Sequence, residues 1–249
     1  RDIRDIAQLL EGRSYPDTEI IPLYARLPAP QQRRAFVVGG RRRIILSTNV
    51  AETSVTIPGI RVVIDSGVAR VKRYNPRTQV EKLHVEPISQ ASANQRKGRC
   101  GRVGPGVCIR LYDEQDFGQR DAYTDPEIKR SSLASVILSM QQLDLGKVEG
   151  YPFLDPPTPA AIKDGYRELT ELGALDRHKR LSALGRKLCR FSVEPRYARM
   201  LVEGARQGVL SDLLTIVAAL STDDPRLRPP EQRDEADTAH ARYATPTSD

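Results

Sequence analysis

Two short apolar runs, each bounded by loop-forming residues, constrain the fold of this chain more than any other feature. They are Arg-Ile-Ile-Leu-Ser at 43–47 and Arg-Val-Val-Ile-Asp at 61–65. Near-continuous β-branched runs of this length are typical of parallel strands covered on both faces. A helical pattern over Ile3–Leu10, a short strand over Glu19–Tyr24 and a helix over Pro30–Phe36 precede them. This alternation predicts an α/β fold with a parallel sheet.

The following stretch predicts a β-hairpin inserted into that domain. Residues Val68–Leu83 alternate in polarity around the turn Asn75-Pro76-Arg77-Thr78. Ser89 can then cap a helix that runs toward Arg99, and Gly106–Tyr112 supplies a further strand. Together these elements predict the back half of an α/β nucleotide-type domain.

The second half of the chain reads as helical. Thr124–Glu127 combines capping-box spacing with proline in the first turn, and predicts a helix that continues through Leu143. A second helix runs from Thr158 to Gly173, and the turn-tipped Leu175–Leu181 follows it. Helices followed by a small hairpin predict a winged helix. The helices expected at Pro195–Gln207 and Ser211–Leu220 open a helical bundle.

We therefore expect three domains, at residues 1–117, 118–185 and 186–249. The chain begins as if in the middle of a domain. From Ser221 it is polar and rich in proline, and it stops without a capping element, as if it were cut.

The charge of the chain is concentrated in its first half. Residues 1–110 hold 20 Lys and Arg against 9 Asp and Glu, a net charge of +11, whereas residues 111–249 hold 19 against 23, a net charge of −4. A basic half favours a polyanionic partner such as a nucleic acid backbone or bound phosphates. A solvated basic surface explains the charge alone equally well.

Composition excludes several classes of protein. No apolar run approaches the roughly 18 residues of a membrane span, and no signal peptide is recognisable. The three cysteines (Cys100, Cys108 and Cys189) cannot build a disulfide framework, and with three scattered histidines they predict no metal site. We expect a cytoplasmic protein with no membrane partner.

The strongest chemical signal is the segment Gln95–Arg102, which reads Q-R-x-G-R-x-G-R. On one helix Gln95, Arg99 and Arg102 fall at i, i+4 and i+7 and face the same ligand. Paired guanidiniums suit a triphosphate, because they neutralise charge in the transition state, and glutamine can orient the attacking water. The alternative is a basic helix end that binds solvent or a carboxylate. Two glycines within a helix lower its stability and add no local interaction that would compensate, which favours the functional interpretation.

The second signal is the segment Ser47–Ile57, rich in hydroxyl and amide side chains, which follows a buried strand. In open α/β sheets, ligands bind at the carboxyl ends of the strands. Uncharged donors suit contacts to phosphate and ribose, although such loops are more often simple turns and caps.

These segments together resemble the DEAH/RHA branch of superfamily 2 helicases, and most closely the bacterial HrpA-type RNA helicases. Ser47–Ile57 resembles the family's motif V, Gln95–Arg102 its motif VI, and residues 1–6 the tail of its motif IV. Pro87–Asn94 favours the HrpA type. The family's winged helix and the start of its ratchet-like bundle correspond to the sequences at 172–175 and 193–196. The resemblance implies a RecA-like fold for the first domain.

The resemblance also implies roles at the nucleotide. Arg99 and Arg102 correspond to the arginine fingers, and Gln95 to the residue near the γ-phosphate and the attacking water. Ser54 corresponds to the serine that senses the nucleotide state. Phe36 corresponds to the aromatic that stacks on the base, and a core phenylalanine is an equally good interpretation of it.

Further implied roles concern RNA. Thr48 and Asn49 correspond to contacts with the RNA backbone, and Thr56 is a weaker candidate. Pro58 stands where many eukaryotic relatives carry an acidic residue near the ribose, so that contact is in doubt. Arg77 is a candidate because the hairpin is basic: it carries Arg70, Lys72, Arg73, Arg77 and Lys82 against Glu81. Such a ribbon suits a wedge at a duplex junction, and a solvated scaffold is the alternative.

The family's phosphate loop and its Asp-Glu-x-His box are not in this sequence. The resemblance therefore implies that an upstream RecA-like domain of the same chain holds ATP or another NTP with Mg²⁺, and that this fragment alone is inactive. It also implies RNA as the partner and 3′-to-5′ movement, with ribosome-bound RNA and DNA–RNA hybrids open as targets. A non-catalytic winged-helix module that binds nucleic acid or protein is the alternative function.

Overall fold

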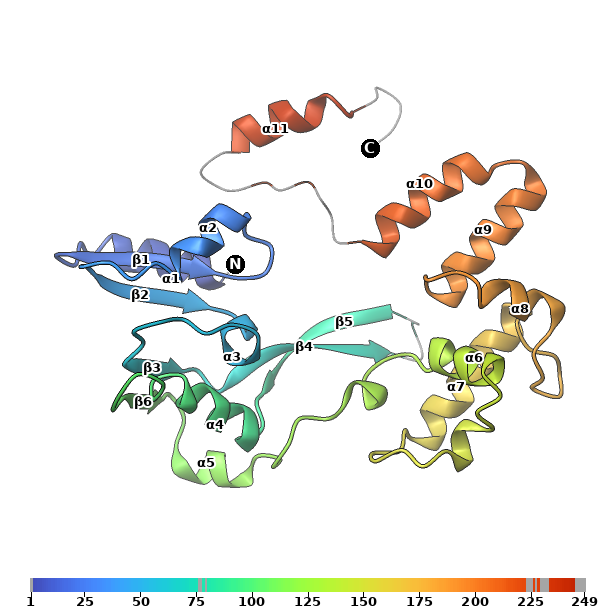
Figure 1. Ribbon diagram of the computed structural model, residues 1–249, viewed down its shortest axis with the longest axis horizontal. Helices are drawn as coiled ribbons and strands as arrows, with labels where there is room; N and C mark the ends of the chain where they lie inside the picture. Colours follow the sequence, from blue (N-terminus) through green and yellow to red (C-terminus); the bar gives the residue numbers. More distant parts are fainter. Residues whose placement is uncertain are drawn as a thin grey trace. The chain divides into compact units, whose positions relative to one another are not determined.

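The structure, a computed structural model, describes residues 2–75, 78, 80–222, 226, 228 and 233–244. It divides into two compact units (Figure 1). The first unit is Arg1–Arg73 with Glu81–Pro126, and the second is Tyr74–Val80 with Glu127–Asp249. The chain therefore changes unit within the hairpin as well as after Pro126.

The first unit alternates helices and strands, as the sequence predicts. Its elements in chain order are α1 (Asp2–Glu11), β1 (Thr18–Leu23), α2 (Ala29–Arg34), β2 (Arg42–Ser47), α3 (Val50–Thr53), β3 (Val62–Asp65), α4 (Gln90–Gly98), β6 (Val107–Arg110) and α5 (Glu114–Gln119). The predicted hairpin forms from β4 (Val68–Asn75) and β5 (Val80–Pro87), which pair with each other.

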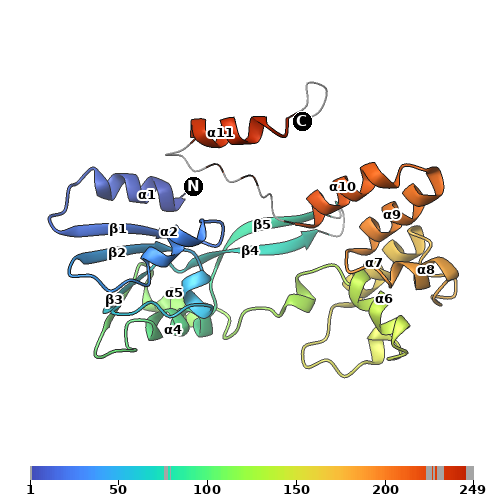
Figure 2. The same cartoon turned by 45° about the horizontal axis from the view of Figure 1, so that its top comes forward.

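The predicted parallel pairing is present in two strand pairs of the first unit. β1 pairs with β2, with Ile20 opposite Ile44, and the two strands run side by side in Figure 1 and Figure 2. β3 pairs in parallel with β6, with Val63 opposite Cys108. The carboxyl ends of β2 and β3 lead directly into the segments that carry the candidate residues.

The cover of β3 differs from the expectation that both faces are buried. Val62 and Ile64 are 56% and 66% exposed, whereas Asp65 is buried. Because side chains alternate along a strand, the exposed pair shares one face, and α4 packs against β3. In the described part of the chain, a helix therefore covers only one face of this strand.

The core of the first unit lies around β1. Ile21, Leu23 and Ala35 are buried, and Phe36 and Ile45 pack against them while partly buried. Ile21 and Leu23 are two residues apart, so they extend from the same face of the strand. This cluster fixes β2 and the chain that leaves it.

The second unit is helical. Its elements are the 3₁₀ turns η1 (Glu127–Lys129) and η2 (Val148–Gly150), and the helices α6 (Ala134–Gln142), α7 (Pro159–Glu171), α8 (Ala183–Leu188), α9 (Pro195–Gln207), α10 (Leu210–Ser221) and α11 (Arg233–Ala241). Leu133, Ile137, Leu169 and Leu188 are fully buried in its core. The predicted helices at 158–173, 195–207 and 211–220 are confirmed.

The small hairpin of the predicted winged helix is present after α7. Thr158 Oγ1 accepts a hydrogen bond from the Ala161 amide at 3.2 Å and caps the helix, which ends before Gly173 with its φ of +72°. Leu175 and Leu181 then form an antiparallel bridge.

One expectation for the second half was wrong. Thr124 does not cap a helix: its hydroxyl lies 3.0 Å from the Ser89 Oγ, only η1 follows it, and α6 begins at Ala134. Ser132 Oγ accepts from the Ala134 amide at 3.2 Å instead. The polar region after Ser221 contains α11, a helix without buried residues that no apolar pattern announces. Among the described residues, no helix combines the length and apolar character that crossing a bilayer requires.

Candidate functional site

The helix that carries the arginine motif is shorter than the sequence predicts. The Ser92 amide donates to Ser89 Oγ at 3.2 Å and caps α4, as expected, but the helix ends at Gly98. Arg99 is its C-cap residue, and Arg102 lies beyond the helix. The expectation of one continuous helical stripe was wrong, because glycine is a poor helix former and the chain leaves the helix at Gly98.

The segment Ser47–Ile57 lies where the sequence places it, at the carboxyl end of β2. Thr48 and Asn49 precede the single turn of α3, and Ser54 is its C-cap residue. The Val50 amide donates to Thr48 Oγ1 at 3.5 Å. The four candidate residues of this segment are exposed: Thr48, Asn49, Ser54 and Thr56.

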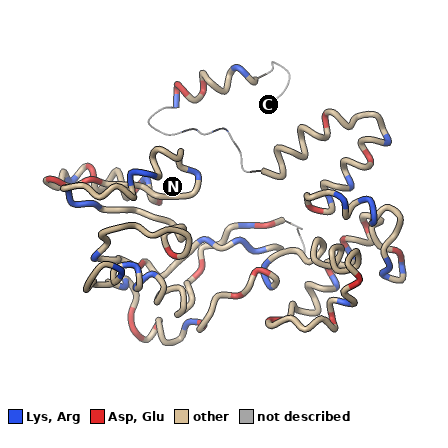
Figure 3. The backbone as a smooth tube through the Cα atoms, in the orientation of Figure 1, with Lys and Arg blue, Asp and Glu red and all other residues tan. Residues whose placement is uncertain are grey.

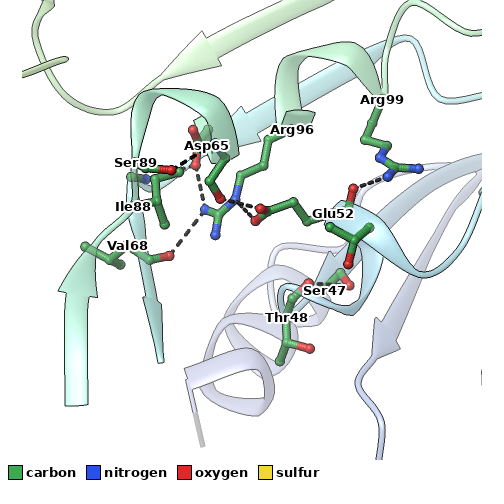
Figure 4. Close-up of polar contacts among 12 residues, drawn as sticks. Ser47, Thr48, Glu52, Asp65, Val68, Ile88, Ser89, Arg96 and Arg99 are labelled. Carbon is green, nitrogen blue, oxygen red and sulfur yellow. Dashed lines mark hydrogen bonds and ion pairs between the residues drawn. The ribbon is translucent and has the colours of Figure 1, made fainter. Parts of the chain in front are cut away.

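The two arginines beyond α4 contact this segment directly. Arg99 donates to the backbone carbonyl of Val55 at 3.0 Å and also to the carbonyl of Glu52 (Figure 4). Arg102 donates to the hydroxyl of Thr56. The structure thus brings together two of the three predicted catalytic residues and the segment predicted to contact nucleotide and RNA. Gln95 is exposed on α4.

The arginine pair carries two like charges close together. Burial, and then the positive charge of Arg102, lower the pKa of the Arg99 guanidinium. The hydrogen bonds described for both side chains go to neutral oxygens of carbonyls and a hydroxyl. An anion placed between the two guanidiniums would relieve their repulsion, and a phosphate offers the required acceptors.

A third arginine, Arg96, was missed by the sequence analysis. It lies between the carboxylates of Glu52 and Asp65, at 2.8 and 2.7 Å, with a side chain that is 15% exposed. Asp65 offered a signal for this arrangement. It ends an apolar strand, and a carboxylate that is buried there requires a charged or hydrogen-bonding partner.

The remaining candidates stand apart from this cluster. Phe36 is half-buried and packs on Ile21, Leu23 and Ala35, as the core interpretation requires. Arg77 lies outside the described residues. Within the described ranges, no group of three or more His, Cys, Asp and Glu side chains could hold a metal ion.

Family models of helicases match most of the chain. The model described as "Helicase conserved C-terminal domain" matches residues 1–104. "Helicase associated domain (HA2), winged-helix" matches residues 166–193, and "Helicase associated domain (HA2), ratchet-like" matches residues 194–249.

Similar curated proteins and solved structures point the same way. The chain is 51% identical over 254 residues to the ATP-dependent RNA helicase HrpA of Escherichia coli, and 49% identical over 256 residues to the HrpA homolog of Haemophilus influenzae. Both alignments cover 100% of the chain and 20% of the relative. A crystal structure of the Escherichia coli DEAH/RHA helicase HrpB matches with a TM-score of 0.83 at 32% identity, over 99% of this chain and 33% of that one. The chain thus spans about a fifth of the length of the HrpA relatives.

Proposed function

The chain belongs to the DEAH/RHA-type superfamily 2 helicases and is similar to HrpA, and from this premise we propose that the full-length protein is an ATP- or NTP-dependent RNA helicase. In this proposal the chain comprises three parts: the second RecA-like domain of the motor, a winged helix and the start of a ratchet-like bundle. We place their boundaries at residues 1–117, 118–185 and 186–249.

The observation that carries this proposal is the contact of Arg99 and Arg102 with the segment that follows β2. The guanidiniums of Arg99 and Arg102 donate hydrogen bonds to uncharged carbonyl and hydroxyl oxygens. The same segment carries exposed hydroxyl and amide side chains. Such arginines can stabilise the charge that develops during phosphoryl transfer. The neighbouring Thr48 and Asn49 can bind an RNA backbone without reading its sequence.

We assign the individual roles from the correspondence with the family's motifs, and that of Arg77 from the basic composition of the hairpin. Arg99 and Arg102 act as arginine fingers, Gln95 orients the attacking water and Ser54 senses the nucleotide. Phe36 stacks on the base. The RNA contacts are Thr48, Asn49, Thr56 and Arg77.

The metal and the direction of movement rest on the family alone. The described residues do not offer the ligand set of a Mg²⁺ site. By resemblance to the family we assign Mg²⁺ to an upstream RecA-like domain, and we derive no step through it. Translocation from 3′ to 5′ and action in the cytoplasm, on ribosome-associated or other RNA, belong to the same proposal.

The arginine fingers can be tested in the full-length protein. Arg99→Ala and Arg102→Ala should each reduce NTP turnover by about 10³-fold or more, the usual loss when such an arginine is removed. RNA affinity should change little. Steady-state hydrolysis and an RNA-binding titration on the same preparation measure both quantities.

Arg41→Ala is the matched control, because Arg41 is exposed in the same unit and forms a surface ion pair with Asp17 at 3.5 Å. Turnover like that of the wild type in both finger variants would refute the assignment. A protein that binds RNA but hydrolyses no NTP would favour the alternative, a non-catalytic winged-helix binding module.

A further inference from the structure

The guanidinium of Arg96, on α4, contacts three other elements of the first unit (Figure 4). Its Nε donates to Glu52 Oε2 on α3 at 2.8 Å, and one terminal nitrogen donates to Asp65 Oδ1 at the end of β3 at 2.7 Å. The same nitrogen donates to the Val68 carbonyl at 3.2 Å. The side chains of Glu52 and Asp65 are 11% and 0% exposed. Arg96 therefore ties α4 to α3, to β3 and to the start of β4.

The hydrogen bonds of this cluster favour the charged forms of Asp65 and Arg96. Burial alone would raise the pKa of the Asp65 carboxyl, but hydrogen bonds from the Gly67 amide, Arg96 and Tyr112 outweigh it, so the pKa lies below its usual value. Burial likewise acts to lower the pKa of Arg96, and the hydrogen bonds with Glu52 and Asp65 raise it above its usual value. Removing one of these three side chains would leave a buried charge of its partners without an opposite charge.

Arg96 differs in this respect from the two arginines that follow it. Arg99 and Arg102 donate to carbonyl and hydroxyl oxygens, whereas Arg96 donates to two carboxylates. All of these bonds have a charged donor, but only those of Arg96 also have charged acceptors, so Arg96 alone of the three forms ion pairs, and these are buried. Arg99 and Arg102 can therefore exchange their present acceptors for a phosphate at small cost, while Arg96 stays in place.

Glu52 is the residue through which this anchor reaches the rest of the site. It lies in the single turn of α3, between Asn49 at one end and Ser54 at the other. Its side chain binds Arg96 and its backbone carbonyl binds Arg99. A displacement of either end of α3 must therefore act on both arginines.

We propose that Arg96, held by Glu52 and Asp65, is a positioning residue that couples RNA contact at the start of α3 to the arginines that bind nucleotide. This inference rests on the proposed function. In this proposal neither Arg96 nor Glu52 contacts nucleotide or RNA. Replacing either residue should therefore reduce the stimulation of hydrolysis by RNA and leave RNA affinity largely unchanged.

The test measures an RNA-stimulation factor in the full-length protein, defined as the hydrolysis rate at saturating RNA divided by the rate without RNA. Glu52→Gln keeps the size of the side chain and removes its charge. We expect the factor to fall about tenfold, within the usual range of coupling between two sites. The affinity for RNA, measured separately, should stay within about twofold of the wild type, a change of less than ~0.5 kcal/mol.

Glu168→Gln is the matched control. Glu168 is also a buried carboxylate, 7% exposed, and accepts from Arg196 Nε at 2.6 Å, but it lies in the second unit. It should leave the stimulation factor unchanged. Arg96→Lys is the second test variant: it keeps the positive charge but cannot reach both carboxylates with a planar fork. It serves if circular dichroism shows that Glu52→Gln does not fold.

The outcomes separate the inference from the function on which it rests. A stimulation factor that is unchanged in the folded variants refutes the coupling role. Equal losses with and without RNA also refute it, because they indicate a purely structural role. If the wild-type protein shows no hydrolysis that RNA stimulates, the proposed function itself fails.

Discussion

Among single residues, Phe36 shows how one side chain can belong to the core and still be available to a ligand. It follows α2 and packs on Ile21, Leu23 and Ala35 while remaining half-buried. Burial of one part of the ring contributes to stability, and the accessible part retains an aromatic surface. The two interpretations of Phe36 are therefore compatible.

Base stacking by Phe36 predicts a loose choice of nucleotide. Because every nucleobase offers a stacking face, the full-length protein should hydrolyse all four nucleoside triphosphates with KM values of similar size. Phe36→Leu, which keeps an apolar side chain for the core, should raise all four KM values in parallel. Steady-state kinetics with each triphosphate measures this, and strict use of ATP would contradict Phe36 as the main base contact.

The sequence singled out the two segments that meet in the structure, but it did not predict their arrangement. Arg99, Arg102 and the segment Ser47–Ile57 were predicted from residue types and spacing, and they do meet. The helical stripe was wrong because spacing alone does not show where a helix ends at glycine. Arg96 was missed because its partners lie more than thirty residues away in the chain, beyond the reach of any local pattern.

At the scale of elements, the hairpin of β4 and β5 is basic, and several of its residues bond to other parts of the protein. Arg70 pairs with Asp2 at 3.0 Å, and Arg73 forms a two-pronged pair with Glu86 at 2.6 and 2.7 Å. Near the tip, the Tyr74 amide donates to the Arg130 carbonyl at 2.8 Å. Several of its basic groups are thus engaged by carboxylates, which the basic composition of the hairpin alone did not indicate.

A wedge role for the hairpin remains testable. Replacement of 75–78 by a short glycine turn should impair strand separation far more than RNA-stimulated hydrolysis, because Arg99 and Arg102 are untouched. Both activities should be measured on one full-length preparation, after circular dichroism has verified folding. Unwinding that survives the replacement, or hydrolysis that falls equally, would identify the hairpin as scaffold.

Helix caps made within a few residues were predicted better than contacts made between distant parts of the chain. Thr158 and Ser89 cap helices as expected, since the interaction is contained within a few residues. The capping box at Thr124 failed because its hydroxyl contacts Ser89, a residue far away in the chain. The cover of β3 likewise depends on packing, which the composition of a strand does not specify.

For the molecule as a whole, charge is the property that bears most directly on a partner. The chain carries a net charge of +7, and Figure 3 shows Lys and Arg in both units. Cations that contact a nucleic acid backbone release condensed counterions, which makes affinity depend on salt.

RNA affinity should therefore fall steeply as salt rises. For single-stranded RNA, the plot of log K against log salt should be linear, with a slope of about −0.7 for each phosphate that the protein neutralises. Arg77→Ala should make this slope shallower by about one such unit, and Arg41→Ala serves as the control. Fluorescence anisotropy titrations between about 50 and 200 mM KCl cover the useful range. A slope near zero would contradict a backbone-binding surface.

The attachment of Tyr74 limits how this protein can be divided or recombined. Tyr74 belongs with the second unit, where its hydroxyl donates to Glu168 Oε2 at 3.4 Å, and burial followed by the charge of Glu168 raises the pKa of its phenol to about 12. A fragment that starts at Glu127 would leave Glu168 without this donor. A chimera that exchanges the second unit between relatives would have to include residues 74–80 as well as the helices after Pro126. In this chain, the second folded unit is therefore not one continuous segment of the sequence.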